Sequence, residues 1–345
     1  MKKKRVLILG GAGFIGLGIA KYLGENKNYN ITIADIFSPG QKDADFDQVV
    51  SDYSIKVIEG DFASLESYKQ LSNNYDFVYM LASVVGVNRC IEEPHEVIRI
   101  NTALIQNSLE WITDNNIGKV LFSSSSECYA ATTDTFNYPV PTPEKVPLSI
   151  SEIGHPRFTY AVTKMLGESA FLSYGKEYRF PVTIVRYQNI FGPRMGFKHA
   201  IPHLVQRFYE GQNPFKIYGA DQTRAFCYIT DASEGTVLAL ENEKSDQEIY
   251  HIGSPEEITI EELTKTVGSL MDYKGAYEAA PTYPGSVSRR CPDISKSIKN
   301  LGYAPKVHWK DGLEETVSWY IDFYKSGTPI YSGGFKTPDE LSYKG

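Results

Sequence analysis

A tyrosine and a lysine four positions apart are the first pair in the chain whose types and spacing could carry chemistry. They begin and end the segment YAVTK at residues 160–164. On a helix, positions i and i+4 lie on one face, so the phenol and the ammonium would be neighbours. A free phenol has a pKa near 10 and is a poor base at neutral pH, but nearby positive charge stabilises the phenolate. We therefore expect Tyr160 to accept a proton from a hydroxyl group, with Lys164 as its partner.

Four serines at 123–126 and a glutamate at 127 end a short segment, Val120–Ser123, that is expected to be a strand. A serine at the end of this strand could hydrogen-bond both the phenol and a reacting hydroxyl. The carboxylate of Glu127, beside Ser126, could remove a proton made acidic by a neighbouring ketone. Glu127 could instead cap the local backbone or pair with a lysine. Since YxxxK alone is common on helices, its position after this serine run favours a catalytic interpretation.

A glycine-rich segment, GGAGFIG at residues 10–16, follows the apolar run Val6–Leu9 and precedes a helical pattern. Its glycine spacing is typical of a dinucleotide-binding turn, in which the start of a helix receives the pyrophosphate. The first glycine permits the tight turn, the second admits the phosphates, and the third allows close packing of helix and strand. The residues expected to contact the cofactor here are Gly10, Gly13, Phe14, Ile15 and Gly16.

Two acidic residues follow the next strands in the places that a dinucleotide requires. Asp35 ends the second apolar run and would accept hydrogen bonds from the adenosine ribose. Its charge would repel a 2′-phosphate, which favours NAD over NADP. Asp61 follows the third run and could meet the adenine amino group, or it could simply cap the next helix.

The elements around these motifs alternate between strand and helix through the first half of the chain. This order predicts an α/β protein with a Rossmann-type, doubly wound parallel sheet and a smaller C-terminal substrate-binding lobe. We expect an NAD-binding domain at residues 1–188, to which part of 225–255 returns, and a lobe at 189–345 that mainly binds substrate. The expected strands are 6–9, 31–34, 56–59, 77–81, 120–123 and 183–186, and the expected helices are 15–24, 64–71, 101–115, 160–178, 200–210, 259–271 and 311–324.

Composition limits the partners that the protein could have. The 345 residues carry a formal net charge of −7, so the overall field gives no reason to bind nucleic acid or an anionic membrane. No apolar run is long enough to span a bilayer, and four widely spaced cysteines suggest neither a disulfide framework nor a metal site. We expect a cytoplasmic protein without a metal.

Taken together, these motifs resemble the extended short-chain dehydrogenase/reductase family, and within it the nucleotide-sugar epimerases, dehydratases and decarboxylases. The resemblance covers nearly the whole chain. It includes the segments GGAGFIG, SSSSECYA at 123–130, YAVTK, RYQNIFGPR at 186–194 and RAFCYITD at 224–231. A narrower resemblance, to bacterial capsular GDP-heptose 4-dehydrogenases, is not carried by any single residue.

The resemblance implies roles for further residues. It implies NAD as cofactor, a nucleotide-diphosphate sugar as substrate, and a homodimer through the helices expected at 101–115 and 160–178. Ser125 would fill the catalytic serine position, and Phe62, Leu81 and Ala82 would line the cofactor site. Local guanidinium groups would also be needed to hold a diphosphate on an acidic protein. The residues implied to bind substrate are Asn189, Lys198, Phe215, Ile217, Tyr218, Arg224 and Arg289 or Arg290.

Alternatives remain open for several of these residues and for the reaction. Phe215, Ile217 and Tyr218 could be core residues, Arg224 could be an ion-pair partner, and one of Arg289 and Arg290 could be solvated. We expect oxidation at C4 of the sugar, giving a 4-keto intermediate or product, as in a 4-dehydrogenase or a 4,6-dehydratase. A UDP-sugar 4-epimerase or a UDP-glucuronate decarboxylase is the alternative. An alcohol reductase acting on a non-sugar substrate would be a different class.

Overall fold

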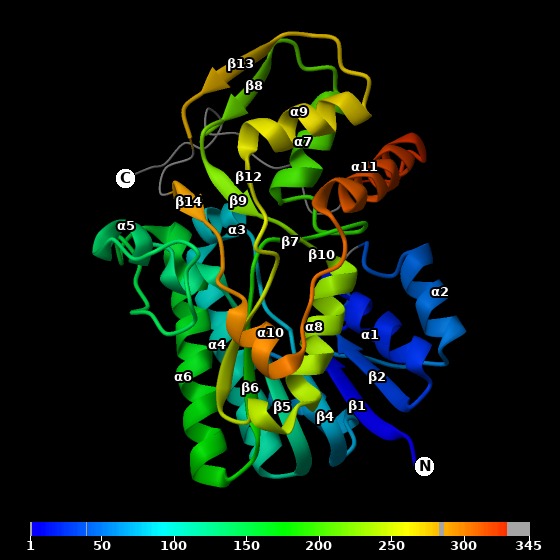
Figure 1. Ribbon diagram of the computed structural model, residues 1–345. Coiled ribbons are helices and arrows are strands. Elements are labelled where there is room, and N and C mark those ends of the chain that lie inside the picture. The colour runs from blue at the N-terminus through cyan, green and yellow to red at the C-terminus, as the bar shows by residue number, and fades with distance from the viewer. Residues whose placement is uncertain (1, 39, 283–285, 330–345) are drawn as a thin grey trace.

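Seven parallel strands form the central sheet of the protein, seen at the bottom of Figure 1. The computed structural model describes residues 2–38, 40–282 and 286–329. The strand order is β11-β6-β5-β4-β1-β2-β3, with the change of direction beside β1 that defines a doubly wound sheet. The α/β, Rossmann-type architecture is therefore confirmed. The strands are β1 (Lys4–Leu9), β2 (Tyr29–Asp35), β3 (Lys56–Glu59), β4 (Asn74–Met80), β5 (Asn116–Ser125), β6 (Val182–Tyr187) and β11 (Glu248–Ile252).

Helices cover both faces of this sheet. Successive side chains of β1 point to opposite faces of the sheet. Val6 and Ile8 belong to the core shared with the helices at 14–26 and 229–241, whereas Leu7 and Leu9 belong to the core shared with the helices at 94–113 and 159–178. All four of these side chains are fully buried. The helices of this domain are α1 (Phe14–Asn26), α2 (Ala44–Asp52), α3 (Val87–Glu92), α4 (Pro94–Thr113), α5 (Thr132–Phe136), α6 (Thr159–Tyr178), α8 (Ile229–Glu241) and α10 (Ser295–Leu301).

A smaller lobe lies above the carboxyl ends of the strands (Figure 1). Its core is rich in aromatic side chains, among them Phe208 and Phe215, whose stacked rings have centroids 3.7 Å apart. Its elements are β7 (Ile190–Phe191), α7 (Ala200–Tyr209), β8 (Phe215–Tyr218), β9 (Thr223–Ala225), β10 (Cys227–Tyr228), β12 (Glu257–Thr259), α9 (Ile260–Leu270), β13 (Tyr277–Ala280), β14 (Arg289–Arg290) and α11 (Trp309–Lys325). The end of the predicted second lobe, residues 330–345, lies outside the described residues.

The chain crosses between the two parts more than once. After β7, α7, β8 and β9 in the lobe, helix α8 packs against α1, and β11 joins the sheet beside β6. The expected helix at 64–71 is a short 3₁₀ helix, Leu65–Gln70. No helix in the described part of the chain is long and apolar enough to cross a membrane.

Candidate active site

The glycine-rich loop has the geometry that a dinucleotide cradle requires. Gly10 has a φ of 83°, and a Cβ there would lie 2.6 Å from the backbone nitrogen of Ala82. A Cβ on Gly16 would lie 2.5 Å from the carbonyl oxygen of Gly10, so glycine is needed for helix α1 to approach the loop. At Gly13, at the start of α1, the carbonyl oxygen of Gly10, at 3.3 Å, is the one atom of the described residues, outside its neighbouring residues and its own helix backbone, within 4 Å of such a Cβ, so the other sides of this residue are open. The loop therefore leaves space beside the helix N-terminus, where phosphate oxygens are stabilised.

Asp35 lies at the end of β2 and is 6% exposed. Its carboxylate accepts hydrogen bonds from the backbone N–H groups of Ala12, at 2.9 Å, and Phe37, at 3.1 Å. Burial raises the pKa of Asp35, although these backbone donors lower it in part. The carboxylate thus joins β2 to the glycine-rich loop, in the position expected for the adenosine ribose.

The other predicted cofactor residues surround the same edge of the sheet. Asp61 is exposed and accepts a hydrogen bond from the N–H of Ala63 at 2.9 Å, so its local role is that of a turn residue. Phe62 is buried in the core. The N–H groups of Leu81 and Ala82 both donate to the carbonyl of Leu9 at 2.9 Å, which holds the end of β4 against the glycine-rich loop.

Tyr160, Lys164 and Ser125 come together at the carboxyl end of β5. Tyr160 and Lys164 lie on one face of α6, with the ammonium 5.5 Å from the centroid of the phenol ring. Lys164 is 4% exposed and donates to the carbonyl of Ser123 at 2.8 Å. The hydroxyl of Ser125 lies close enough to that of Tyr160 to lower the pKa of the phenol in part. The structure therefore brings together the three residues that the sequence predicts for proton transfer.

Electrostatics at Tyr160 differ from the simple expectation. Burial raises the pKa of the phenol, Cys128 and Glu127 raise it further, and the Ser125 hydrogen bond lowers it only in part. Burial also lowers the pKa of Lys164 to about 8. In the protein alone, burial therefore keeps the pKa of the phenol high. The expectation that Lys164 and the positive nicotinamide of NAD together stabilise the phenolate stays a prediction. A phenolate at neutral pH requires a further positive charge beside it.

Glu127 lies against an arginine from the second lobe. Its Oε1 is 2.5 Å from Nη1 of Arg290, which also donates to the hydroxyl of Ser126 at 3.4 Å. Burial would raise the pKa of Glu127, but Arg290 and Arg157, with a smaller effect from Arg224, lower it to about 2. Glu127 is therefore an ion-pair partner, one of the two alternatives that its sequence position left open, although the partner is arginine and not lysine.

Arg157 was not identified from the sequence, although it stands one helical turn before Tyr160. Its Nε is buried and has no hydrogen-bond partner in the described part of the chain. Burial lowers the pKa of Arg157, and Arg290 lowers it further. Burial and Arg290 also lower the pKa of Arg224 to about 9. We call Arg157, Arg224, Arg290 and Glu127 the arginine cluster. With three cations and one anion, this cluster carries a surplus positive charge inside an acidic protein.

Arg224 and Arg290 are neighbours because β9 and β14 pair in parallel, with these two residues in register. Arg224 is held by several bonds, the shortest from Nη1 to the carbonyl of Thr223 at 2.7 Å. Arg289 points the other way: it is half exposed and forms a bidentate pair with Glu257, at 2.8 and 2.7 Å. Only Arg290 of this adjacent pair faces the catalytic residues.

The remaining predicted substrate residues lie in different environments. Phe215 and Ile217 are 0% and 3% exposed in the lobe core, the alternative that their sequence positions left open. Tyr218, at the end of β8, is half-buried. Asn189 has a φ of 44° and donates from its amide to the carbonyl of Ala225 at 2.9 Å, beside Arg224. Lys198 is half-buried, and its Cβ lies 4.0 Å from the position of a Cβ on Gly86.

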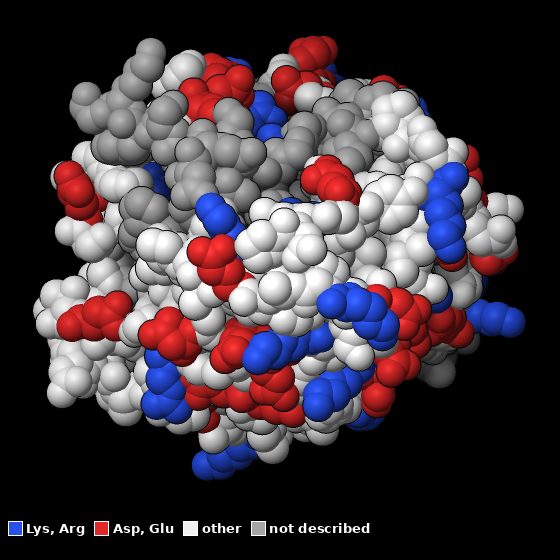
Figure 2. Space-filling view, turned by 90° about the horizontal axis from the view of Figure 1, so that it is seen from above, with Lys and Arg blue, Asp and Glu red and all other residues white. Residues whose placement is uncertain are grey.

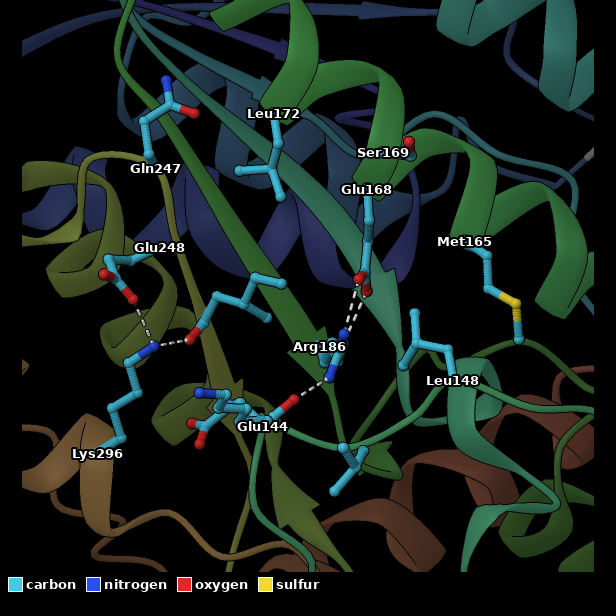
Figure 3. Close-up of a pocket in the computed structure, with 13 residues that line it drawn as sticks. Glu144, Leu148, Met165, Glu168, Ser169, Leu172, Arg186, Gln247, Glu248 and Lys296 are labelled. Carbon is cyan, nitrogen blue, oxygen red and sulfur yellow. Dashed lines mark hydrogen bonds and ion pairs between the residues drawn. The ribbon is translucent and has the colours of Figure 1, made fainter. Parts of the chain in front are cut away.

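A buried ion pair between Glu168 and Arg186, also absent from the sequence prediction, lies beside the end of β5 that carries the serines. Glu168, one turn beyond Lys164 on α6, receives Nε and Nη2 of Arg186 at 2.7 Å each and the hydroxyl of Ser124 at 2.5 Å. Figure 3 shows the pair in the wall of a hollow of about 540 Å³ at the β11 edge of the sheet. This hollow contains none of the predicted catalytic residues.

The distribution of charged side chains on the surface gives no large region of positive charge on the described part of the face seen in Figure 2. Figure 2 shows acidic and basic side chains interspersed on the face seen from above, without an extended basic patch on that face. An anionic substrate would therefore be recognised by local groups such as the arginine cluster.

Comparison with known proteins identifies the family. Residues 6–253 match the NAD dependent epimerase/dehydratase family. The chain is 33% identical to UDP-N-acetyl-alpha-D-glucosaminuronate decarboxylase of Bacillus cytotoxicus, over 92% of this chain and 98% of that protein. It is 27% identical to human dTDP-D-glucose 4,6-dehydratase, over 92% and 90%. The chain belongs to the NAD dependent epimerase/dehydratase family and is an NAD-dependent enzyme.

Solved structures of similar fold also belong to enzymes that act on nucleotide sugars. A variant of UDP-glucuronic acid 4-epimerase from Bacillus cereus, solved with a fluorinated UDP-glucuronic acid and NAD, has a TM-score of 0.82 and 27% identity to this chain. The alignment covers 93% of this chain and all of that one. The relatives are decarboxylases, dehydratases and epimerases of nucleotide sugars, so they share a substrate class but differ in the final reaction.

Proposed function

We propose that the protein oxidises C4 of a nucleotide-diphosphate sugar, giving a 4-keto intermediate or product. The observation that carries the proposal is the arginine cluster placed beside Ser125, Tyr160 and Lys164. The proton-transfer residues are suited to alcohol oxidation, and the surplus positive charge is suited to a substrate with several negative charges. An alcohol reductase acting on a neutral substrate would have no use for this charge.

The residues present suit NAD as cofactor. The open side of Gly13 and the start of α1 would receive the pyrophosphate, and Asp35 would receive the adenosine ribose. When bound, NAD supplies the hydride acceptor and the positive charge that Tyr160 lacks in the protein alone. Ser125 then orients the sugar hydroxyl, Tyr160 accepts its proton, and the Lys164 ammonium stabilises the resulting phenolate.

The low pKa of Glu127 affects the step after oxidation. A carboxylate with a pKa of about 2 is a weak base, because base strength follows pKa. Removal of the C5 proton, which 4,6-dehydration requires, is therefore disfavoured while Arg290 holds Glu127. We infer that 4,6-dehydration is disfavoured relative to reactions that need no base at C5.

Decarboxylation is the second candidate. Once C4 is a ketone, a carboxylate attached at C5 can leave as carbon dioxide without a base removing the C5 proton. The arginine cluster could hold such a carboxylate, and the Bacillus cytotoxicus relative acts, by its name, on a uronic acid sugar. A uronate substrate would account for the three guanidinium groups close to the reacting carbons.

Product analysis tests these proposals. We would incubate the purified enzyme with GDP-, UDP- and dTDP-linked hexoses, heptoses and uronic acids, and measure product masses. Loss of two hydrogens indicates 4-oxidation with release, loss of carbon dioxide decarboxylation, loss of water dehydration, and no change epimerisation. Incubation in deuterated water adds a check on Glu127, since a hexose whose C5 proton is removed incorporates deuterium. Absence of turnover with every nucleotide sugar would contradict the proposal.

A homodimer through α4 and α6 is also a proposal. The two helices pack against each other and expose large apolar side chains, including Ile98 at 46%, Leu166 at 44% and Tyr178 at 57%. A second copy would cover these side chains. Sedimentation equilibrium of the wild type and of Leu166→Glu should show a dimer and a weakened dimer, and a wild-type monomer would contradict it.

A further inference from the structure

Arg194, in the segment that enters the second lobe, makes three contacts that connect two parts of the NAD-binding domain, the glycine-rich loop and residues 41–43. Its Nε lies 2.6 Å from Oδ2 of Asp43, its Nη1 donates to the carbonyl of Ala12 at 3.0 Å, and its Nη2 donates to the carbonyl of Gln41 at 2.7 Å. The side chain is only 10% exposed. Asp43 begins helix α2 and uses its other oxygen to accept from the N–H of Phe46. Arg194 therefore fixes the glycine-rich loop relative to the chain that follows β2.

The contacts of Arg194 lie next to the site predicted for the cofactor. Residue 12 belongs to the loop that would receive the pyrophosphate, and its peptide groups are held from two sides. Asp35 accepts from the N–H of Ala12 at 2.9 Å, and Arg194 donates to the carbonyl of Ala12. Arg194 also contributes to lowering the pKa of Asp35, so its charge lies within electrostatic reach of that carboxylate. The three contacts of Arg194 thus border the site for the adenosine half of NAD.

The backbone at Arg194 adopts a conformation that is energetically unfavourable for this residue type. Arg194 has a φ of 66°, a left-handed conformation that residues other than glycine rarely adopt. The lobe holds the segment in place: Tyr320 of α11 hydrogen-bonds the carbonyl of Met195. A contact between the two parts lies nearby, where Nε1 of Trp319 donates to Oδ2 of Asp45 at 2.8 Å. One contact therefore holds the Arg194 segment within the lobe, and the other holds the lobe against the start of α2.

We propose that Arg194 is a positioning residue that retains NAD(H) on the enzyme between turnovers, by tying the second lobe to the glycine-rich loop and to Asp43. Escape of the adenosine half requires these segments to separate, and three hydrogen bonds from one buried guanidinium oppose that separation. A resident cofactor of this kind can take up hydride and return it within one site. The proposal concerns the cofactor alone and does not depend on which sugar is the substrate.

The test measures release of NADH from the holoenzyme. Enzyme loaded with NADH is mixed with excess NAD, and the loss of bound-NADH fluorescence gives the dissociation rate. Arg194→Met should release NADH about tenfold faster or more, since charge-assisted hydrogen bonds are strong and tenfold corresponds to about 1.4 kcal/mol. Arg194→Lys should restore only part of the retention, because one ammonium cannot reach all three acceptors.

Asp43→Asn keeps the helix cap but removes the charge that faces Arg194, and it should also accelerate release. If the two residues act as a pair, the double variant should be no faster than Arg194→Met. Lys306→Met is the matched control: it removes an exposed pair with Glu234 elsewhere between the two parts, and release should not change.

Release rates within twofold of wild type in both Arg194→Met and Asp43→Asn would overturn the proposal. If Arg194→Met fails to fold, Asp43→Asn and Arg194→Lys decide on the same criterion, with thermal midpoints at saturating NAD as the check on folding. Because no sugar is present, faster release supports the proposal even if no nucleotide sugar is turned over.

Discussion

Replacing Glu168 with glutamine should destabilise the protein strongly, although the side chain changes by only one atom. Glu168 is 4% exposed and Arg186 is 2% exposed, and two bonds of 2.7 Å join them. In Glu168→Gln the Arg186 cation stays buried without its counter-charge. Removing one partner of a buried pair costs about 3–5 kcal/mol. Since domains are stable by only about 5–15 kcal/mol, this is a large fraction of the free energy of unfolding.

Urea unfolding followed by circular dichroism would measure the effect, with Glu168→Leu/Arg186→Met as the matched control. The double variant removes both charges and keeps apolar volume, so most of the loss should be recovered. Because Ser124 donates to Glu168 beside Ser125, Glu168→Gln should also lower kcat more than it raises KM. A loss below about 1 kcal/mol in Glu168→Gln, or a double variant as unstable as the single one, would refute the explanation.

Three further predictions concern the catalytic centre. Tyr160→Phe should lower kcat by about 10²–10⁴-fold with little change in NAD binding. Steady-state kinetics and a fluorescence titration with NAD would measure the two quantities, and unchanged turnover would contradict the role of Tyr160 as the base. Arg224→Ala should raise the KM for the nucleotide sugar by about tenfold or more, and indifference would favour a non-sugar substrate. Arg290→Met should lose about 2 kcal/mol at pH 7, because Arg290 is the largest of the three arginine contributions that together lower the pKa of Glu127 from 4.5 to about 2. That stabilisation is complete above pH 4.5 and is lost as the pH falls toward 2, so the difference between Arg290→Met and wild type should shrink over this range. A constant difference in unfolding experiments would contradict the assignment.

Much of the fold could be predicted because local signals agree with the global arrangement. The apolar runs, the glycines at 10, 13 and 16 and the acid at 35 all specify the same strand–loop–helix unit. Helical spacing alone predicts that Tyr160 and Lys164 lie together, and the family resemblance singles out Ser125 among the four serines at a strand end. Strand β11 was not predicted as a strand, because Glu248–Ile252 is only five residues long, although part of 225–255 was expected to return to the NAD-binding domain. Its partner β6 supplies the hydrogen bonds that define it.

Interactions between distant segments were the part that could not be predicted. Glu127 and Arg290 are 163 residues apart, and only the pairing of β14 with β9 brings the arginine to the catalytic strand. The same limit applies to Arg194 and Asp43, which are 151 residues apart. Arg157 and Glu168 could have been found, since each stands about one helical turn from Tyr160 or Lys164. A search for charged residues on the catalytic face of that helix would have detected both.

The arginine cluster also affects the step that follows oxidation in this chain. Glu127 is a weak base only because Arg290 and Arg157 face it, and any anion that binds these arginines competes with Glu127 for them. A substrate carboxylate near C5 would therefore raise the pKa of Glu127 toward its ordinary value, just where a proton donor to C5 is needed after loss of carbon dioxide. A neutral hexose or heptose would leave the ion pair intact, so Glu127 would stay a weak base and the C5 proton would be retained. We therefore expect the charge of the sugar, acting through Arg290, to affect the reaction that follows oxidation.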